Sequence, residues 1–365
     1  MSLTPTPVPT GTDVLNALPH TGGRITAAWN AMLALLHEQL PAVITLANST
    51  WGLHLPKVKG YIVAGEKAPE EGPWIEIAAV PSGQTMSPVE NRDTSHVVIH
   101  VAYPAPLTRQ SVDNASDICC LIRALLYYYR GPYADAAGRD LWSGMMPTGI
   151  DLGPQDFTTA NFSGCALHLT LEQYPQESMW APGSATPTVA PTAQHVLDGL
   201  PFCGGRLSLA RNGVMELLHK TLLPALVAAN SAYGLHLPVP TTGEDVGMYA
   251  LGEVVRPKTP LVVVGAGART EPAGLQVFSD TLEMTVHCLF AREEVRSGLD
   301  NPTDFSNLVR AALWYGLRGF VTAAGLQAWD TLVFNSTAVQ QDQQNLLSVR
   351  LSYTALQGPN ALRWG

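Results

Sequence analysis

The chain has 365 residues, a length typical of two domains of ordinary size. Its formal net charge is −9 and its lysines and arginines form no cluster, which argues against a protein that binds duplex DNA. Only 14% of the residues are charged, so we expect partner protein to cover part of the surface. No basic stretch followed by an apolar stretch opens the chain, and no apolar run reaches about 18 residues, so we expect neither a secretory signal nor a membrane span.

A long internal repeat dominates the sequence. Residues 14–56 align without a gap with residues 196–238, at an offset of 182, and 21 of these 43 positions are identical. Unrelated sequences would match at about 3 positions. The similarity returns at an offset of 187, where DNASDICCLIRALLYYYRG at 113–131 faces DNPTDFSNLVRAALWYGLRG at 300–319. The period is too long for a solenoid repeat and indicates a duplicated domain.

The repeat predicts where the domains begin and end. A segment rich in proline, alanine and threonine separates the two copies and is typical of an extended linker. We predict an N-terminal extension at 1–12, a first domain at 13–175, a linker at 176–194, a second domain at 195–357 and a C-terminal tail at 358–365.

An amphipathic helix is predicted to open each copy. Its apolar positions run from Ile25 to Val43 and from Leu207 to Leu226. Pro41 and Pro224 fall inside these patterns and are expected to kink or split the helices. Three strands follow, predicted at 59–66, 74–80 and 96–103 in the first copy and at 247–255, 261–265 and 282–290 in the second.

The second half of each copy contains another helix and a closing strand. The helix is predicted from Asn114 to Gly131 and from Asn301 to Gly319, with the asparagines as N-caps. An alternating strand at 165–171 or 347–353 ends each copy, and a shorter strand near Trp142 or Trp329 precedes it. The predicted fold class is α+β: two homologous domains, each an antiparallel sheet with two main helices on one face, in the order α-β-β-β-α-β-β.

LVVVGAGART at 261–270 is the motif closest to a cofactor site, because a strand running into Gly265 and Gly267 resembles a dinucleotide-binding turn. Such a turn needs a helix behind the glycines to hold the pyrophosphate. Pro272 stands where that helix would run, and the third glycine is missing. A glycine-rich hairpin or loop is the favoured interpretation.

His54 and His236 lie in Gly-Leu-His-Leu-Pro, the longest run that both copies share. We interpret them as residues that hydrogen-bond the backbone where the first helix turns into the sheet, since a catalytic or metal site needs further groups. The aromatic runs Tyr127–Tyr129 and Trp314–Tyr315 are expected to pack or to form a subunit interface.

The five cysteines form no CxxC pair, and we expect reduced, mostly buried thiols in a protein made in a cytoplasm. Paired carboxylates, GxSxG and a P-loop are also missing from the sequence. We predict no catalytic, cofactor-binding or metal-binding residues, no cofactor, and a protein that is not an enzyme.

Each copy resembles the tail terminator, or tail completion, proteins of long-tailed bacteriophages. The resemblance spans nearly the whole chain through the order and length of the elements. It is carried best by SDTLEMTVHCLFARE, a polar gap and NPTDFSNLVRAALWYGLRG, matched in the first copy by TSHVVIHVAYP and NASDICCLIRALLYYYRG.

The resemblance implies a virion structural protein that forms a ring at the head-proximal end of the tail, in the neck. The ring would join the tail tube to the head-side connector, without membrane contact, and DNA would pass through its lumen without specific binding. Family rings are generally built from six single-unit chains, so a chain with two units implies either a trimeric or a hexameric ring. Assembly would take place in the host cytoplasm.

Three alternatives stay open at this point. The chain could be another head–tail connector or a component of a contractile apparatus. It could be an enzyme with a nucleotide site near Gly265–Gly267, or a carbohydrate- or receptor-binding module that uses Trp51, Trp142 and Tyr233.

Overall fold

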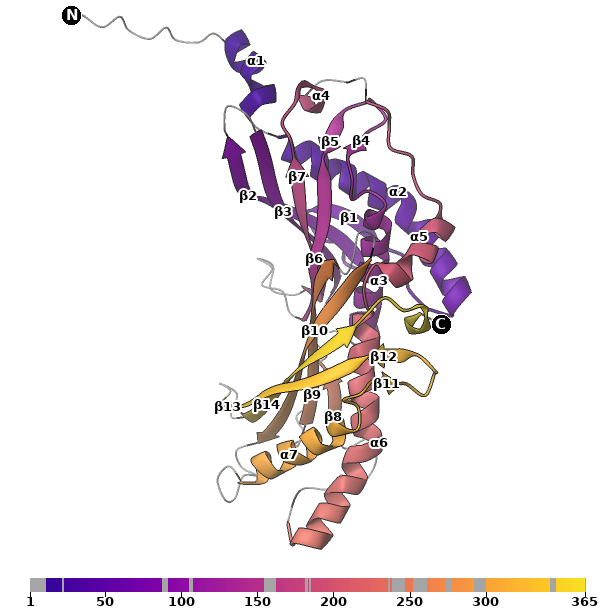
Figure 1. Cartoon of the computed structure of the whole chain (residues 1–365), viewed down its shortest axis with the longest axis vertical. Coiled ribbons are helices and arrows are strands. Elements are labelled where there is room, and N and C mark those ends of the chain that lie inside the picture. Colours follow the sequence, from indigo (N-terminus) through magenta and orange to yellow (C-terminus); the bar gives the residue numbers. More distant parts are fainter. Residues whose placement is uncertain are drawn as a thin grey trace, which may run out of the picture.

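The fold is α+β, with the two halves of the chain at opposite ends of an elongated molecule (Figure 1). The computed structural model describes residues 11–364 except 22, 87–90, 105–107, 154–161, 181–182, 184, 236, 238–246, 252–260, 273–276, 292–299 and 342–345. The helices are α1 Gly11–Thr21, α2 Ile25–Trp51, α3 Arg109–Tyr127, α4 Glu177–Trp180, α5 Ala193–Gly199, α6 Leu207–Tyr233 and α7 Asp300–Trp314, with short 3-10 turns η1 Leu200–Phe202 and η3 Ala361–Arg363.

One ten-stranded sheet crosses both halves within the described residues, in the order β1-β2-β3-β7-β6-β9-β10-β14-β13, with β8 beside β9. Its strands are β1 Gly60–Val63, β2 Trp74–Met86, β3 Asn91–Pro104, β6 Gly144–Gly153, β7 Phe162–Gln173, β8 Gly247–Ala250, β9 Leu261–Pro272, β10 Phe278–Ala291, β13 Thr331–Gln341 and β14 Leu346–Gln357. Two small hairpins stand apart, β4 Tyr133–Ala134 with β5 Asp140–Trp142, and β11 Phe320–Val321 with β12 Gln327–Trp329.

The predicted sheets differ from the observed one in two respects. They are continuous, because β6 of the first half pairs with β9 of the second half over Gly149–Asp151 and Gly267–Arg269. The sheet is also mixed rather than wholly antiparallel, since β1 pairs parallel with β2 and β8 pairs parallel with β9. The two halves therefore share one sheet and one continuous apolar core.

Alternation along the strands separates a covered face from a polar face. Val97, Ile99 and Val101 on β3 are fully buried and pack with the buried stripes of the helices. His96 on the same strand and Glu283 on β10 point to the other face, which carries the polar residues. Burial of alternate residues is the pattern of a sheet that has helices on one side.

The helices differ from their predicted bounds mainly at the ends. α2 and α6 run through Pro41 and Pro224 without being split, and each ends at a glycine, Gly52 or Gly234, with φ of 63°. α3 begins before the predicted cap, because Thr108 accepts a hydrogen bond from the Ser111 amide. Asn114 therefore lies inside α3. In the second half α7 begins at Asp300, so Asn301 lies in its first turn.

Matched residues make matched contacts in the two halves. The indole N–H of Trp142 donates to the Tyr129 carbonyl (2.8 Å), and that of Trp329 donates to the Gly316 carbonyl (2.7 Å). Gln173 and Gln357 both donate to a carbonyl of the preceding hairpin, at Leu141 and Ala328. The tryptophan contacts follow the offset of 187, and the two glutamines are related by an offset of 184. That the halves arose by duplication and behave as separate domains stays a prediction.

The ends of the predicted domains contain more structure than expected. α1 occupies the end of the N-terminal extension and the start of the first domain, and α4 lies in the predicted linker. Residues 185–192 have neither helix nor strand. In this stretch the Thr188 amide donates to the Ala134 carbonyl (3.1 Å), and the Thr188 hydroxyl accepts from the Ala134 amide (3.1 Å), so the segment is tied to the first half.

Candidate functional site

The contact between the two halves is the most elaborate polar site in the described part of the chain. Arg123 of α3 is buried and donates to both carboxylate oxygens of Asp280 on β10, at 3.0 and 2.9 Å. It also donates to the Thr270 hydroxyl (3.0 Å) and the Gly205 carbonyl (2.9 Å). Burial would lower the pKa of Arg123, but the Asp280 carboxylate raises it above its usual value. The guanidinium thus stays charged in the core.

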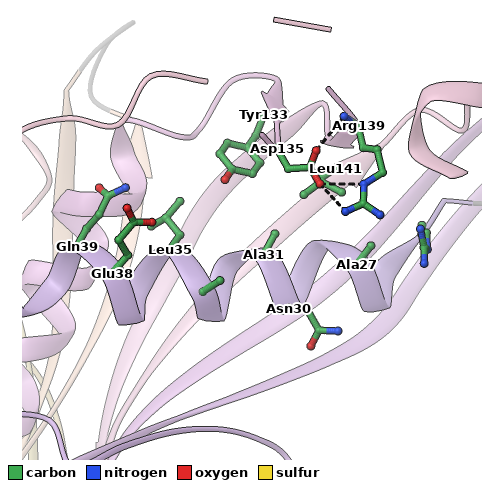
Figure 2. Close-up of a pocket in the computed structure, with 12 residues that line it drawn as sticks. Ala27, Asn30, Ala31, Leu35, Glu38, Gln39, Tyr133, Asp135, Arg139 and Leu141 are labelled. Carbon is green, nitrogen blue, oxygen red and sulfur yellow. Dashed lines mark hydrogen bonds and ion pairs between the residues drawn. The ribbon is translucent and has the colours of Figure 1, made fainter. Parts of the chain in front are cut away.

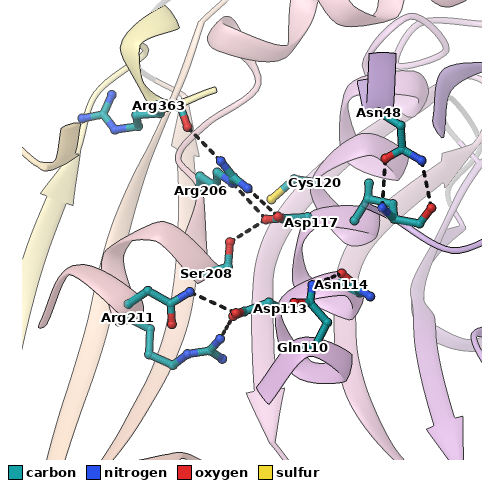
Figure 3. Close-up of polar contacts among 12 residues, drawn as sticks. Asn48, Gln110, Asp113, Asn114, Asp117, Cys120, Arg206, Ser208, Arg211 and Arg363 are labelled. Atoms are coloured by element: carbon teal, nitrogen blue, oxygen red, sulfur yellow. Dashed lines mark hydrogen bonds and ion pairs between the residues drawn. The ribbon is translucent and has the colours of Figure 1, made fainter. Parts of the chain in front are cut away.

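A second ion pair lies one and a half turns earlier on α3. Asp117 accepts from Arg206 at 3.1 and 2.6 Å and from the Ser208 hydroxyl, all across the contact between the halves (Figure 3). The Arg206 guanidinium also lies over the Trp364 ring, 4.9 Å from its centroid. Asp113, a turn further toward the start of α3, pairs with Arg211 of α6 (Figure 3). The carboxylates of α3 are therefore used to hold the second half.

Apolar groups complete this contact. Val196, Leu197 and Leu200 of α5 and η1 are buried against α2 and α3. The Tyr128 hydroxyl donates to the His195 carbonyl, and the Tyr127 ring meets Phe278 edge-on at 5.8 Å. Each carboxylate of this contact is used in an ion pair, although the buried Arg123 Nε has no hydrogen-bond partner among the described residues. The geometry is that of a structural joint between protein units.

A groove at the far end of the second half is open by comparison. It measures about 560 Å³ and lies between α7 and the strands β13 and β14. Trp314 is 71% exposed and Tyr315 81% exposed at its border, so these two aromatic residues are not packed inside the chain, and their interface role stays a prediction. We call it the aromatic groove; it is lined by Asn307, Arg310, Ala311, Trp314, Tyr315, Leu317, Phe334 and Tyr353.

The glycine motif at 265–267 is part of a strand. β9 runs from Leu261 to Pro272 and pairs with β10 throughout, so neither a phosphate-binding turn nor the hairpin or loop that we favoured is present. A Cβ on Gly265 would lie 2.5 Å from the Thr285 hydroxyl. Gly267 pairs with Asp151 where the two halves meet. The glycines permit close approach of neighbouring chains within the sheet.

His54 is exposed, and His236 lies outside the described residues. The turn that contains these histidines is held instead by an asparagine from the preceding helix. Asn48 donates to the Leu55 carbonyl and accepts from the Leu55 amide, both at 2.9 Å. Asn230 makes the same two bonds with Leu237, at 2.8 and 2.9 Å. The shared motif thus encodes a backbone clamp, carried by a residue that the sequence analysis overlooked.

A histidine cluster lies on the polar face near the junction of β6 and β9. The rings of His96 and His168 stack with centroids 5.3 Å apart, and His168 Nε2 lies 3.0 Å from an Asp151 oxygen. The adjacent hollow measures about 250 Å³, and its lining contains neither cysteine nor serine. The pKa of His96 is lowered by burial and by His168. The cluster supplies no thiol or serine nucleophile.

A larger hollow of about 430 Å³ lies between α2 and the β4–β5 hairpin (Figure 2). Asp135 and Arg139 face each other there, with an Arg139 Nε to Asp135 oxygen distance of 2.9 Å. Burial would raise the pKa of Asp135, but hydrogen bonds from the Arg139 backbone and side chain lower it. Glu38 lies further along α2 (Figure 2). The charged pair is satisfied within the hairpin, so it offers no free acid or base.

The five cysteines are free and buried, as expected from their count and spacing. Burial raises the pKa of Cys120 to about 12, so its thiol stays protonated near neutral pH. The proposed exposed-aromatic module loses one member, because Trp142 is buried, while Tyr233 is 78% exposed.

Sequence reasoning missed the paired charges of the joint. Arg123, Asp280 and Gly205 are separated from one another by 75 to 157 residues, and nothing local indicates that they meet. One signal was available. Arg123 matches Arg310, and Asp280 matches Asp93, at the offset of the repeat, so both charges recur in the two copies.

No group of three or more histidine, cysteine or acidic side chains in the described residues could hold a metal ion. In the same part of the chain, none of the helices has the length and apolar character needed to cross a bilayer. No protein-family model matches the chain, and no curated protein matches it significantly.

Proposed function

We propose that this chain is a structural virion protein of the tail terminator type, which forms a ring at the head-proximal end of a phage tail. The resemblance of each copy to that family supports the proposal. The paired and buried charges described above support it as well, because they are used for joining protein units rather than for chemistry. We propose accordingly that the protein is not an enzyme.

The observation that carries the proposal is the way the two halves join. β9 of the second half extends the sheet of the first half at β6, and α5 packs on α2 and α3. Different surfaces of two similar units meet in this contact, so it is heterologous. A heterologous contact that is repeated closes into a ring when the rotation between units permits it, and otherwise forms a filament.

The ring in this proposal contains three chains with six units in one circle, or six chains with an added layer. Its neighbours are the tail tube on one side and the head-side connector on the other. The net charge of −9 agrees with a lumen through which DNA slides without specific binding.

The direct test is the particle formed by the purified protein. We expect electron microscopy to show rings, and mass photometry to give a mass of three or six times the 39.0 kDa chain. A monomer throughout a concentration series contradicts the proposal. A thermal-shift screen with nucleotides and divalent metals tests the enzymatic alternative, because a specific ligand raises the melting temperature.

A further inference from the structure

We infer that the aromatic groove binds α1 of a second copy of this chain, so that copies join through the contact that already joins the two halves. The inference rests on the proposed structural function and names the interface through which it acts. It follows from residues that are matched in the repeat but differ in whether they have a partner.

The first of these differences concerns the helices that precede α2 and α6. α1 covers the positions that match α5 and η1, with Leu15 facing Leu197 in the alignment at offset 182. Leu197 is only 2% exposed, because α5 packs on α2 and α3, whereas Leu15 is 65% exposed. α1 contacts α4 and projects from the outer end of the first half (Figure 1). An exposed leucine on a short helix is the expected state of an arm whose binding site lies on another molecule.

The binding site that α5 uses has a counterpart in the aromatic groove. Tyr127 and Tyr128 of α3, which contact Phe278 and the His195 carbonyl, match Trp314 and Tyr315 of α7 at offset 187. Trp314 and Tyr315 are exposed. The groove is therefore the α5-binding surface of the second half, present without its helix.

The most specific evidence for the proposed contact comes from the matched buried charges. In the intrachain contact, Asp280 accepts from Arg123 and from the Gly205 amide (2.7 Å). In the first half the matching Asp93 accepts from the matching Gly23 amide. The Asp93 Oδ1 atom is buried and has no hydrogen-bond partner among the described residues. The arginine that would match Arg123 is Arg310, which is exposed in the aromatic groove. Arg310 of one copy thus supplies what Asp93 of the next copy lacks.

Two further residue pairs of the intrachain contact have matched residues that would meet between two copies. Asp117 pairs with Arg206, and their counterparts are Asp304 on α7 and Arg24 beside α1. Trp51 packs on Trp364 with ring centroids 5.6 Å apart. Its counterpart Tyr233 is 78% exposed, and the counterpart of Trp364 is Trp180, at the offset of 184 that also relates Gln173 to Gln357. In the proposed contact Asp304 meets Arg24, and Tyr233 meets Trp180, of the neighbouring copy.

In the described sheet, β13 is an edge strand, and it matches β6, the strand that pairs with the second half. Residues 149–151 of β6 pair with β9, and the matching residues 336–338 belong to β13, the last strand in the described sheet. Both β6 and β13 have a bulge just before this segment. The strand of the next copy that matches β9 is β2, in which Pro81 stands in place of Ala268. Because proline has no backbone N–H, we assign specificity to α1 and the charges rather than to strand pairing.

One chain cannot satisfy its own groove, because α1 and α7 lie toward opposite ends of the molecule (Figure 1). One of the positions at which α1 differs from α5 affects a close contact. A Cβ at Gly199 would lie 2.8 Å from the Tyr128 hydroxyl, and α1 has Ala17 there. The facing Tyr315 must shift slightly, which its exposure permits.

The test uses one variant at each end of the full chain. Leu15→Asp places a charge on α1, and Arg310→Glu reverses the charge in the groove; both residues are exposed, so folding should be retained. We expect each variant alone to lose assembly and to fall to the 39.0 kDa mass of one chain. In an equimolar mixture, each chain keeps one working end, so the mixture should form pairs of one Leu15→Asp and one Arg310→Glu chain. Val189→Asp, at an exposed linker position, is the control and should assemble as the wild type does.

The outcomes separate this interface from the broader function. If the wild type assembles and both end variants assemble equally well, the interface is wrong and the ring proposal stands. If the wild type itself is a monomer at every concentration, both are wrong. Loss of assembly in the single variants without recovery in the mixture contradicts a head-to-tail contact.

Discussion

α5 and α1 come from matched positions of the repeat, yet α5 buries Leu197 against α2 and α3, whereas α1 contacts α4 and leaves Leu15 exposed. The same difference separates Arg123, enclosed by four hydrogen bonds, from Arg310, which is exposed. Similar local sequence thus produces similar local structure, while burial depends on which unit lies next to it. An exposed residue whose counterpart is buried marks a surface that lacks a neighbour.

Removing the buried Arg123 and the exposed Arg310 in turn should give the largest difference in stability between matched residues. Arg123→Ala leaves Asp280 charged in the core without its main partner, and we expect the free energy of unfolding to fall by about 3–5 kcal/mol. Arg310→Ala removes an exposed side chain and should change it by less than about 0.5 kcal/mol in the dilute monomer. Urea unfolding of both variants measures the two changes in the free energy of unfolding. Equal costs would show that the matched arginines have the same surroundings.

His100 on β3 and its counterpart His287 on β10 allow the two halves to be compared through the pH dependence of stability. The pKa of His100 is lowered to about 3, mainly by burial and in part by His168. An unfolded histidine titrates near 6.5, so between these values the unfolded chain binds a proton that the native chain does not, and stability falls as the pH drops. At pH 5 this costs about 2 kcal/mol. Urea unfolding at pH 7 and pH 5 should show a smaller loss for His100→Gln than for the wild type.

His287 is the matched residue in the second half and provides a second test of the same expectation. Its pKa is also lowered, by burial and by Arg350, so His287→Gln should reduce the pH-dependent loss in the same direction. If neither substitution changes the difference between pH 7 and pH 5, the two histidines are not neutral in the native state.

The strands with a clean alternation were predictable because one face of the sheet is buried and the other is polar. β3, β7, β10 and β14 lie close to their predicted positions for this reason. The short strands predicted near Trp142 and Trp329 correspond to β5 and β12, and β6 and β13 were not predicted. Glycine and proline interrupt β6, polar residues interrupt β13, and each of the two strands contains a bulge. Local pattern does not report the pairing of β6 with β9, which depends on contacts between distant segments.

The site was less predictable than the fold. The aromatic pair at Trp314 and Tyr315 was singled out in the sequence, where it was predicted to pack or to form an interface, and the structure shows that both side chains are exposed. The ion pairs were not singled out, since an arginine on a helix and an aspartate on a strand are ordinary surface residues until their positions in the fold are known. Comparing the two copies residue by residue is the step that would have drawn attention to Arg123 and Asp280.

The smallest predicted effect concerns the asparagine clamps, where the two halves should behave alike. Asn48→Ala removes two hydrogen bonds to the buried Leu55 backbone, and Asn230→Ala removes the same two from Leu237. We expect each to lower the free energy of unfolding by about 1–2 kcal/mol, as for unsatisfied buried backbone groups. Asn48→Asp keeps the acceptor for the Leu55 amide but places a carboxylate oxygen against the Leu55 carbonyl, so its cost should be at least as large. Both clamps lie within their own half. Equal losses of stability in the two variants would mean that the halves differ at the contact between them and not in their internal structure. A cost confined to one clamp would mean that the halves already differ before any neighbour binds.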